Sequence, residues 1–136
     1  MRSERYLTKP KQYGLVYHKG TSWVNNLIVM KALPNGLSLT RYGLSVSRRV
    51  GNAVTRNRVK RLFREILRLT PLQSGWDIVF IARPMVASVG YTGLEKSVGS
   101  LLSRARLLKQ LENTAPLEVE VAKNSRRKSN SDEKTF

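Results

Sequence analysis

The stretch VGNAVTRNRVKRLFREILRL, residues 50–69, limits the fold and the partner of this chain more than any other segment. At about 100° per residue its apolar side chains share one stripe. That stripe comprises Val59, Leu62, Phe63, Ile66 and Leu69. The opposite face comprises Asn57, Lys60, Arg61, Arg64 and Arg68, and Arg56 and Arg58 flank the stripe on either side. We expect an amphipathic helix over about 53–69, with Asn52 as its N-cap, that packs on a core and presents cations outward.

The charge of the chain is as unusual as this helix. The net charge is +16 and the isoelectric point is about 11.0. Residues 1–111 hold 20 Lys and Arg against four acids, whereas residues 112–136 hold five of each sign. The expected folded part therefore carries the whole excess, which indicates a polyanionic partner, most simply a nucleic acid.

Three absences narrow the class of protein. Without cysteine there is no disulfide scaffold and no Cys-ligated zinc site. No apolar run approaches the roughly 18 residues that a membrane span needs. The N-terminal MRSERYLTKPK lacks the apolar region of a secretory signal. We expect a soluble cytoplasmic protein with no membrane partner.

The other segments predict an α+β domain, a sheet layer with helices packed on it. Thr8 is a candidate N-cap for a first helix. The predicted elements besides the helix over 53–69 are a helix over about 9–19, strands over 23–33, 39–47 and 77–83, and a helix over 92–109. Polar residues of mixed charge follow. We expect one domain over 1–112 and a disordered polyampholyte tail over 113–136.

The catalytic inventory of the chain is nearly empty. It contains one His, no Cys and, within residues 1–111, four acids. These residues provide no nucleophile with its base, no paired acid and base, and no metal cluster. We therefore assign no catalytic residue and no metal ligand, and we expect neither a small-molecule substrate nor hydrolysis by this chain alone.

The basic helix and the two tyrosines each allow more than one interpretation. The basic helix face could be an ordinary solvated surface, but such surfaces usually mix both signs of charge. A helix-turn-helix motif would need a helix just before residue 53, where a strand over 39–47 is expected instead. Tyr13 and Tyr17, four residues apart on one helix face, suit either core packing or the stacking of unpaired bases. Both interpretations of the tyrosines stay open at this point.

Residues 41–68, RYGLSVSRRVGNAVTRNRVKRLFREILR, resemble the signature of the bacterial ribonuclease P protein component, the family with the RNR motif. That signature is a strand ending in GLSVS, two basic residues, GNAV, and then RNR, a hydrophobic residue and KR. The resemblance continues upstream through LTKPKQYGLVYHKGTS and downstream through GWDIVFIARP, and it covers about residues 5–109.

The resemblance implies a role in tRNA processing. Proteins of this family accompany a catalytic RNA, and the holoenzyme hydrolyses precursor tRNA to free the mature 5′ end. Catalysis and the required magnesium ions belong to the RNA subunit, so the protein itself needs no cofactor. The implied partners are the ribonuclease P RNA and the single-stranded 5′ leader of precursor tRNA.

The resemblance also implies a particular fold. It is a single-domain α+β sandwich in the order α-β-β-β-α-β-α, with a mostly antiparallel central sheet. Its β-α-β crossover around the helix over 53–69 is left-handed. Chain order alone would predict the right-handed form, which is far more common.

Two surfaces follow from the family's motif. The RNR region is expected to contact the catalytic RNA, and it comprises Arg48, Arg49, Asn52, Arg56, Asn57, Arg58, Lys60, Arg61, Arg64 and Arg68. A cleft between the sheet and the first helix is expected to receive the leader, and its residues are Tyr13, Tyr17, Lys31 and Arg41. Lys31 stands where the family often has a further aromatic residue.

Two other classes of protein share the general features of this chain. One is a ribosomal or RNA-chaperone protein that binds RNA through a basic α+β domain, and the other is a nonspecific DNA-binding protein. Composition does not separate them from the ribonuclease P subunit. The combination of GLSVS, GNAV and RNR favours the subunit.

Overall fold

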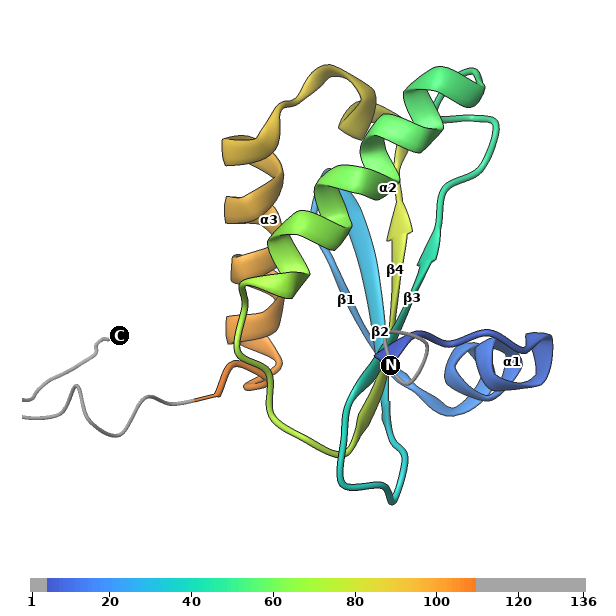
Figure 1. Ribbon diagram of the computed structural model, residues 1–136, viewed down its shortest axis with the longest axis vertical. Coiled ribbons are helices and arrows are strands. Elements are labelled where there is room, and N and C mark those ends of the chain that lie inside the picture. Colours follow the sequence, from blue (N-terminus) through green and yellow to red (C-terminus); the bar gives the residue numbers. More distant parts are fainter. Residues whose placement is uncertain (1–4, 110–136) are drawn as a thin grey trace, which may run out of the picture.

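The structure, a computed structural model, describes residues 5–109. Figure 1 shows the arrangement of these residues, and the order α-β-β-β-α-β-α is confirmed. The elements are α1 (Pro10–Lys19), β1 (Thr21–Val24), β2 (Ile28–Pro34), β3 (Arg41–Ser45), α2 (Ala53–Arg68), β4 (Trp76–Ala82), the short 3-10 helix η2 (Pro84–Ser88) and α3 (Tyr91–Arg104). No helix within these residues is long and apolar enough to cross a membrane.

The four strands form one mixed sheet in the order β1-β2-β4-β3. The β1–β2 and β2–β4 pairs are antiparallel and the β3–β4 pair is parallel, so the expected mostly antiparallel sheet is confirmed. In Figure 1 the chain rises along β3, crosses in front of the sheet as α2, and rises again along β4 on the left of β3. This connection is the left-handed crossover.

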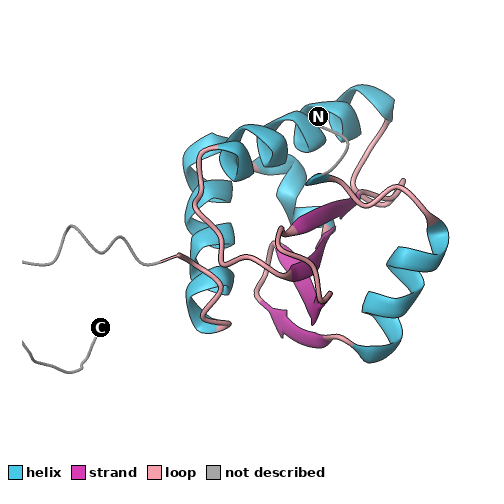
Figure 2. Ribbon diagram, turned by 60° about the horizontal axis from the view of Figure 1, so that its bottom comes forward, coloured by secondary structure: helices cyan, strands magenta, loops and turns pink. Residues whose placement is uncertain are grey.

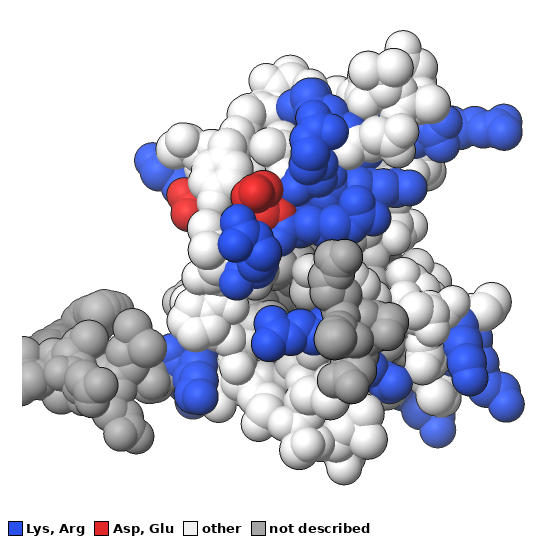
Figure 3. Space-filling view, in the orientation of Figure 1, with Lys and Arg blue, Asp and Glu red and all other residues white. Residues whose placement is uncertain are grey.

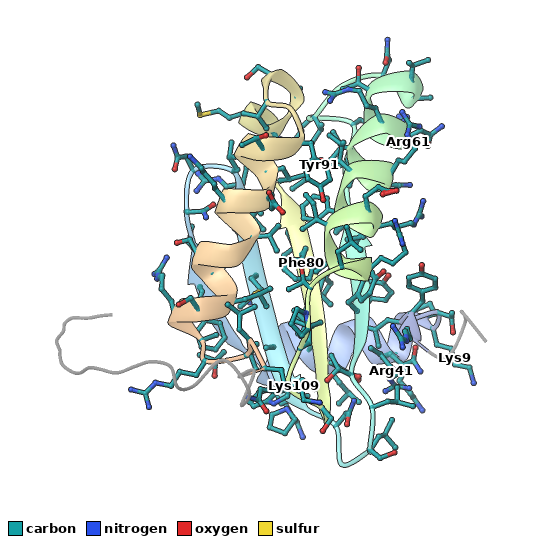
Figure 4. All side chains as sticks on the ribbon, turned by 60° about the vertical axis from the view of Figure 1, so that its left-hand side comes forward. Lys9, Arg41, Arg61, Phe80, Tyr91 and Lys109 are labelled. Carbon is teal, nitrogen blue, oxygen red and sulfur yellow. The ribbon has the colours of Figure 1, made fainter. Side chains whose placement is uncertain are left out.

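Two cores lie on opposite faces of the sheet, because successive side chains of β4 alternate between them. Phe80 packs with α2 and α3, where its ring centroid lies 5.7 Å from that of Phe63. Val79 faces α1 and packs with Val16 and Leu7 in a smaller cluster. Figure 2 shows the strands enclosed between helices, and Figure 4 shows Phe80 beneath α2 and α3.

Helix α2 has the N-cap that the sequence predicts but a slightly different buried stripe. The Asn52 side chain accepts a hydrogen bond from the Thr55 N–H at 2.9 Å. The buried residues of the helix are Val59, Phe63, Ile66 and Leu67. The expectation for Leu69 is wrong, because the helix ends at Arg68 and Leu69 is left 63% exposed. Leu67 takes the inward position instead.

The single strand expected over 23–33 is also wrong. The chain forms β1 and β2 with a tight turn between them. The Asn25 side-chain oxygen accepts hydrogen bonds from the N–H groups of Leu27 at 3.0 Å and Ile28 at 2.9 Å. An asparagine that bonds to the backbone two and three residues ahead stabilises a turn, and here it interrupts an apolar run that reads as continuous.

The start of the first expected helix and the end of the last one need smaller corrections. Lys9, not Thr8, is the N-cap of α1, and the Gln12 side chain accepts hydrogen bonds from the N–H groups of both residues. The final helix ends at Arg104 rather than at residue 109, because Arg106 adopts a positive φ of 61° that turns the chain back. The tail expected over 113–136 lies outside the described residues.

Gly43 provides a test of how α1 is seated on the sheet. A Cβ atom at this position would lie 2.5 Å from the Tyr13 hydroxyl and 2.6 Å from its ring carbon Cε1. We expect Gly43→Ala to displace the ring and lower the free energy of unfolding by about 1–3 kcal/mol, as overpacking does. Urea denaturation measures this change.

The matched control is Gly99→Ala within α3. A Cβ there would have no neighbour within 4 Å, so alanine is expected to stabilise the helix by about 0.5–1 kcal/mol. Equal unfolding midpoints for the two variants would contradict the close contact between Tyr13 and β3.

Candidate nucleic-acid interface

The outward side of α2 and the loop before it form a strongly cationic surface. Figure 3 shows Lys and Arg gathered across α2 on the side turned to the viewer. Among the predicted RNA contacts the exposed residues are Arg48, Arg49, Asn52, Asn57, Arg61, Arg64 and Arg68, and Lys60 is half-buried. The basic face of α2 consists of Asn57, Lys60, Arg61, Arg64 and Arg68. Its geometry suits a line of phosphates, because the exposed cations Arg61, Arg64 and Arg68 follow one another at helical spacing along the second half of α2.

Only one acid accompanies these cations on α2. Glu65 accepts from Arg68 Nη2 at 3.2 Å, and both side chains are largely exposed. An exposed pair of this kind contributes little stability and is easily exchanged for another anion. Figure 4 shows the Arg61 side chain pointing away from the body of the protein.

The two arginines of the RNR segment have different surroundings. Arg58 Nη2 donates to the Ala87 carbonyl at 2.7 Å and Nη1 donates to the Val89 carbonyl at 3.5 Å. Its guanidinium therefore ties α2 to the end of η2. Arg56 lies half-buried on the other flank, and its Nε atom has no hydrogen-bond partner within the described protein. The sequence pattern does not distinguish Arg56 from Arg58. In the described part of the structure, only Arg58 of the two makes side-chain hydrogen bonds that join α2 to another element of the fold.

A cleft of about 620 Å³ opens beside the basic face, between α1, the edge strand β3 and α2. It is lined by Tyr6, Leu7, Tyr13, Tyr42, Gly43, Leu44, Lys60 and Arg64. The Tyr6 ring meets the Tyr42 ring edge to face, with centroids 5.1 Å apart. The lining includes no Asp or Glu, so the cleft combines aromatic surface with two cations.

Two tyrosines of the cleft, Tyr13 and Tyr42, have a pKa above the ordinary value of the side chain. Burial raises the pKa of Tyr13, a smaller opposing effect comes from the Leu44 backbone, and Tyr17 nearby raises it further. Burial and the hydrogen bond with Tyr6 raise the pKa of Tyr42. Tyr13 and Tyr42 are therefore neutral at neutral pH, and they offer the cleft aromatic surface and hydrogen-bonding groups beside its two cations.

The four residues predicted for a leader-binding cleft lie on the α1 side of the molecule, but only Tyr13 lines the cleft itself. Tyr17 lies beside it, 40% exposed, with its ring centroid 6.4 Å from that of Tyr13. Lys31 is half-buried in β2 opposite Val79, on the sheet face that α1 covers.

Arg41 is occupied by a neighbouring carboxylate. Its Nε and Nη2 atoms donate to the two oxygens of the buried Asp77 at 2.9 and 2.7 Å. These hydrogen bonds raise the pKa of Arg41 above its ordinary value. Asn35 donates to the same carboxylate at 2.9 Å. The Nε and Nη2 groups of Arg41 are thus already bound to a buried carboxylate, which leaves fewer of its N–H groups for a ligand.

Several lining residues were missed from the sequence. Tyr6 and Leu7 join the site because the chain before α1 runs beside β3, where the Leu7 N–H donates to the Tyr42 carbonyl at 2.9 Å. Tyr42 and Leu44 alternate with Arg41, Gly43 and Ser45 in the strand expected over 39–47, a pattern that predicts only that they are buried on one face of the sheet. Because β3 lies at the edge of the sheet, these side chains also reach the cleft. Strand alternation gives the face of a residue but not the position of its strand in the sheet.

Metal binding has no candidate cluster among residues 5–109. The structure brings together no group of three or more His, Cys, Asp or Glu side chains within that range.

Comparison with known proteins identifies relatives that span most of the chain. The family model described as Ribonuclease P matches residues 1–106. The ribonuclease P protein component of Dehalococcoides mccartyi strain CBDB1 is 46% identical over 112 residues, which cover 82% of this chain and 93% of that protein. The corresponding protein of Caldanaerobacter subterraneus subsp. tengcongensis is 41% identical over 108 residues, 78% of this chain and 93% of that protein.

Solved structures agree with this assignment. The RNase P protein of Staphylococcus aureus superposes with a TM-score of 0.72 at 29% identity, covering 77% of this chain and 98% of that one. The RNase P protein of Thermotoga maritima gives a TM-score of 0.65 at 31% identity, with 73% and 96% coverage. A basic helix face beside an aromatic cleft, relatives at these identities and a shared fold lead to one conclusion: this chain belongs to the ribonuclease P protein component family.

Proposed function

We propose that this chain binds two RNA elements through adjoining surfaces: the catalytic RNA of ribonuclease P on the basic face of α2, and the 5′ leader of precursor tRNA in the cleft. As a ribonuclease P protein component, the chain is a subunit of a tRNA-processing ribonucleoprotein endoribonuclease. In this proposal the RNA subunit and its magnesium ions supply the chemistry. The protein supplies positioning and charge.

The observation that carries the proposal is the position of Lys60 and Arg64. Both belong to the basic face of α2, and both line the aromatic cleft. A helix that carries phosphate-binding cations on one surface therefore also forms a wall of the neighbouring site. An RNA strand in the cleft and a folded RNA on the helix would lie side by side.

The chemistry of the cleft suits unpaired nucleotides. Aromatic rings stack on bases with little sequence preference, and each stacked base contributes about 1–3 kcal/mol. Lys60 and Arg64 can neutralise the phosphates between those bases and release their counterions. A leader of variable sequence requires this combination of sequence-tolerant contacts.

Cleavage of precursor tRNA at low magnesium tests the function as a whole. Reactions contain a bacterial ribonuclease P RNA with or without this protein, and substrates with a long leader or with none. We expect the protein to stimulate cleavage and to tighten substrate binding only when the leader is present. Equal binding to every RNA with unchanged cleavage would instead support a general RNA-binding role.

Substitution of the two kinds of α2 arginine separates RNA contact from folding. We expect Arg61→Gln to weaken binding to the catalytic RNA and to lower the slope of log K against log salt by about one, without changing the melting temperature. Arg58→Gln removes two hydrogen bonds to carbonyls and should lower the melting temperature. Salt-dependent binding and thermal unfolding measure the two effects, and a salt slope unchanged by Arg61→Gln would contradict the assigned RNA contact.

A second pair of variants tests base stacking beside the cleft. We expect Tyr17→Ala to weaken binding of long-leader precursor tRNA by roughly fivefold to a hundredfold, the loss of one stacked base, and to leave leaderless tRNA unaffected. Leu15→Ala is the matched control, because Leu15 is a similarly exposed apolar residue of the same helix that has no aromatic ring to stack on a base. Equal losses in both variants would mean that Tyr17 has no specific part in leader binding.

A further inference from the structure

A second groove, of about 700 Å³, lies where α2 ends and β3 begins. It is lined by Arg5, Leu39, Thr40, Tyr42, Leu67, Arg68, Leu69, Thr70, Pro71, Leu72, Ser74 and Lys109. Tyr42 borders both this groove and the cleft described above. Neither the proposed leader contacts nor the RNR pattern explains most of this lining.

The second groove combines cations with aliphatic surface. Arg5, Arg68 and Lys109 contribute three positive charges, and no Asp or Glu is among the lining residues. Leu69, just past the end of α2, is 63% exposed, so the groove offers aliphatic surface beside its cations. RNA phosphates would satisfy the cations but not the leucine. The matching ligand carries both carboxylates and aliphatic side chains.

The chain itself provides such a ligand directly after the groove. Lys109 is the last residue that the structure describes, and it lines the groove. The next charged stretch, residues 112–122 with the sequence ENTAPLEVEVA, contains three Glu and no Lys or Arg. The cations of the tail begin only at Lys123. Residues 112–136 thus have a net charge of zero, but an acidic segment over 112–122 precedes the first cation, Lys123.

We propose that residues 112–122 of this chain dock in the second groove. In an extended segment, Leu117, Val119 and Val121 would point to one side, and Glu118 and Glu120 to the other. The aliphatic side would cover the exposed surface of Leu69 and its neighbours. The two carboxylates would then lie at the outer side of the segment, where the long side chains of Arg5, Arg68 and Lys109 can reach them from the edges of the groove.

Distance and tethering both favour this intramolecular contact. An extended chain from Lys109 to Leu117 spans up to about 28 Å, which is ample for a groove that already includes Lys109. A tether of so few residues also gives an effective concentration of about the millimolar range. Weak charge pairs and modest apolar burial therefore suffice to occupy the groove.

Docking of the tail has a consequence for RNA, and this consequence rests on the proposed function. Arg68 belongs both to the second groove and to the basic face of α2. An RNA that binds near Arg68 must compete with the tail carboxylates. Short or poorly matched RNAs lose this competition more readily than a folded RNA that contacts the whole helix.

Nuclear magnetic resonance on the full-length chain tests the docking without RNA. The chain has no cysteine, so Ser125→Cys accepts a single nitroxide label. We expect the label to broaden the amide signals of Leu69, Thr70 and Leu72, and Glu118→Gln with Glu120→Gln to weaken this broadening. The matched control is Asp132→Asn with Glu133→Gln, which makes the same change of net charge and should leave the broadening intact.

Two results would overturn the docking. One is broadening that both charge variants change equally, since the tail would then respond only to net charge. The other is full broadening of isotope-labelled protein without a nitroxide when it is mixed with nitroxide-labelled protein that carries no isotope, since the groove would then hold the tail of a second copy.

Binding of a short oligouridylate at low salt tests the competition. We expect Glu118→Gln with Glu120→Gln to raise the affinity roughly twofold to tenfold, as loss of two exposed charge pairs implies, and the control pair to raise it less. Equal affinities would overturn the competition. If the chain bound no RNA at all, the proposed function would fail, and the resonance experiment would still decide whether the tail docks.

Discussion

The parallel pairing of β3 with β4 is the constraint on which the rest of the structure depends. It forces the intervening chain to cross one face of the sheet, and the apolar stripe of α2 covers that face. The same pairing leaves β3 at the sheet edge, where α1 and the preceding residues pack beside it. The basic helix and the aromatic cleft are neighbours because both are built against this one strand.

The excess of positive charge is a second constraint on the structure. The described part of the chain contains few acids, and two of them are engaged: Asp77 by Arg41 and Glu65 by Arg68. The remaining cations repel one another across a small surface, a cost that the two apolar cores must offset. A bound polyanion would relieve this repulsion. Folding alone therefore leaves most of these cations without an anionic partner among the described residues, and a bound polyanion would provide one.

The features that could be predicted from sequence depend on local periodicity. The stripe of α2, the Asn52 cap and the exposed cations follow from residues a few positions apart, and the structure contains all of them apart from the exchange of Leu69 for Leu67. The turn at Asn25 and the full lining of the cleft could not be read in this way. Each depends on hydrogen bonds or strand order that periodicity does not encode, as do the contacts of Arg58 with residues 87 and 89.

If two RNAs bind side by side as proposed, the shared position of Lys60 and Arg64 has a thermodynamic consequence. Occupation of one surface changes the electrostatic potential felt at the other, so the two binding equilibria are linked. Linkage is reciprocal: the factor by which a leader alters the affinity for the catalytic RNA equals the factor by which the catalytic RNA alters the affinity for the leader. Two cations on one helix would thus couple substrate recognition to the assembly of the subunits.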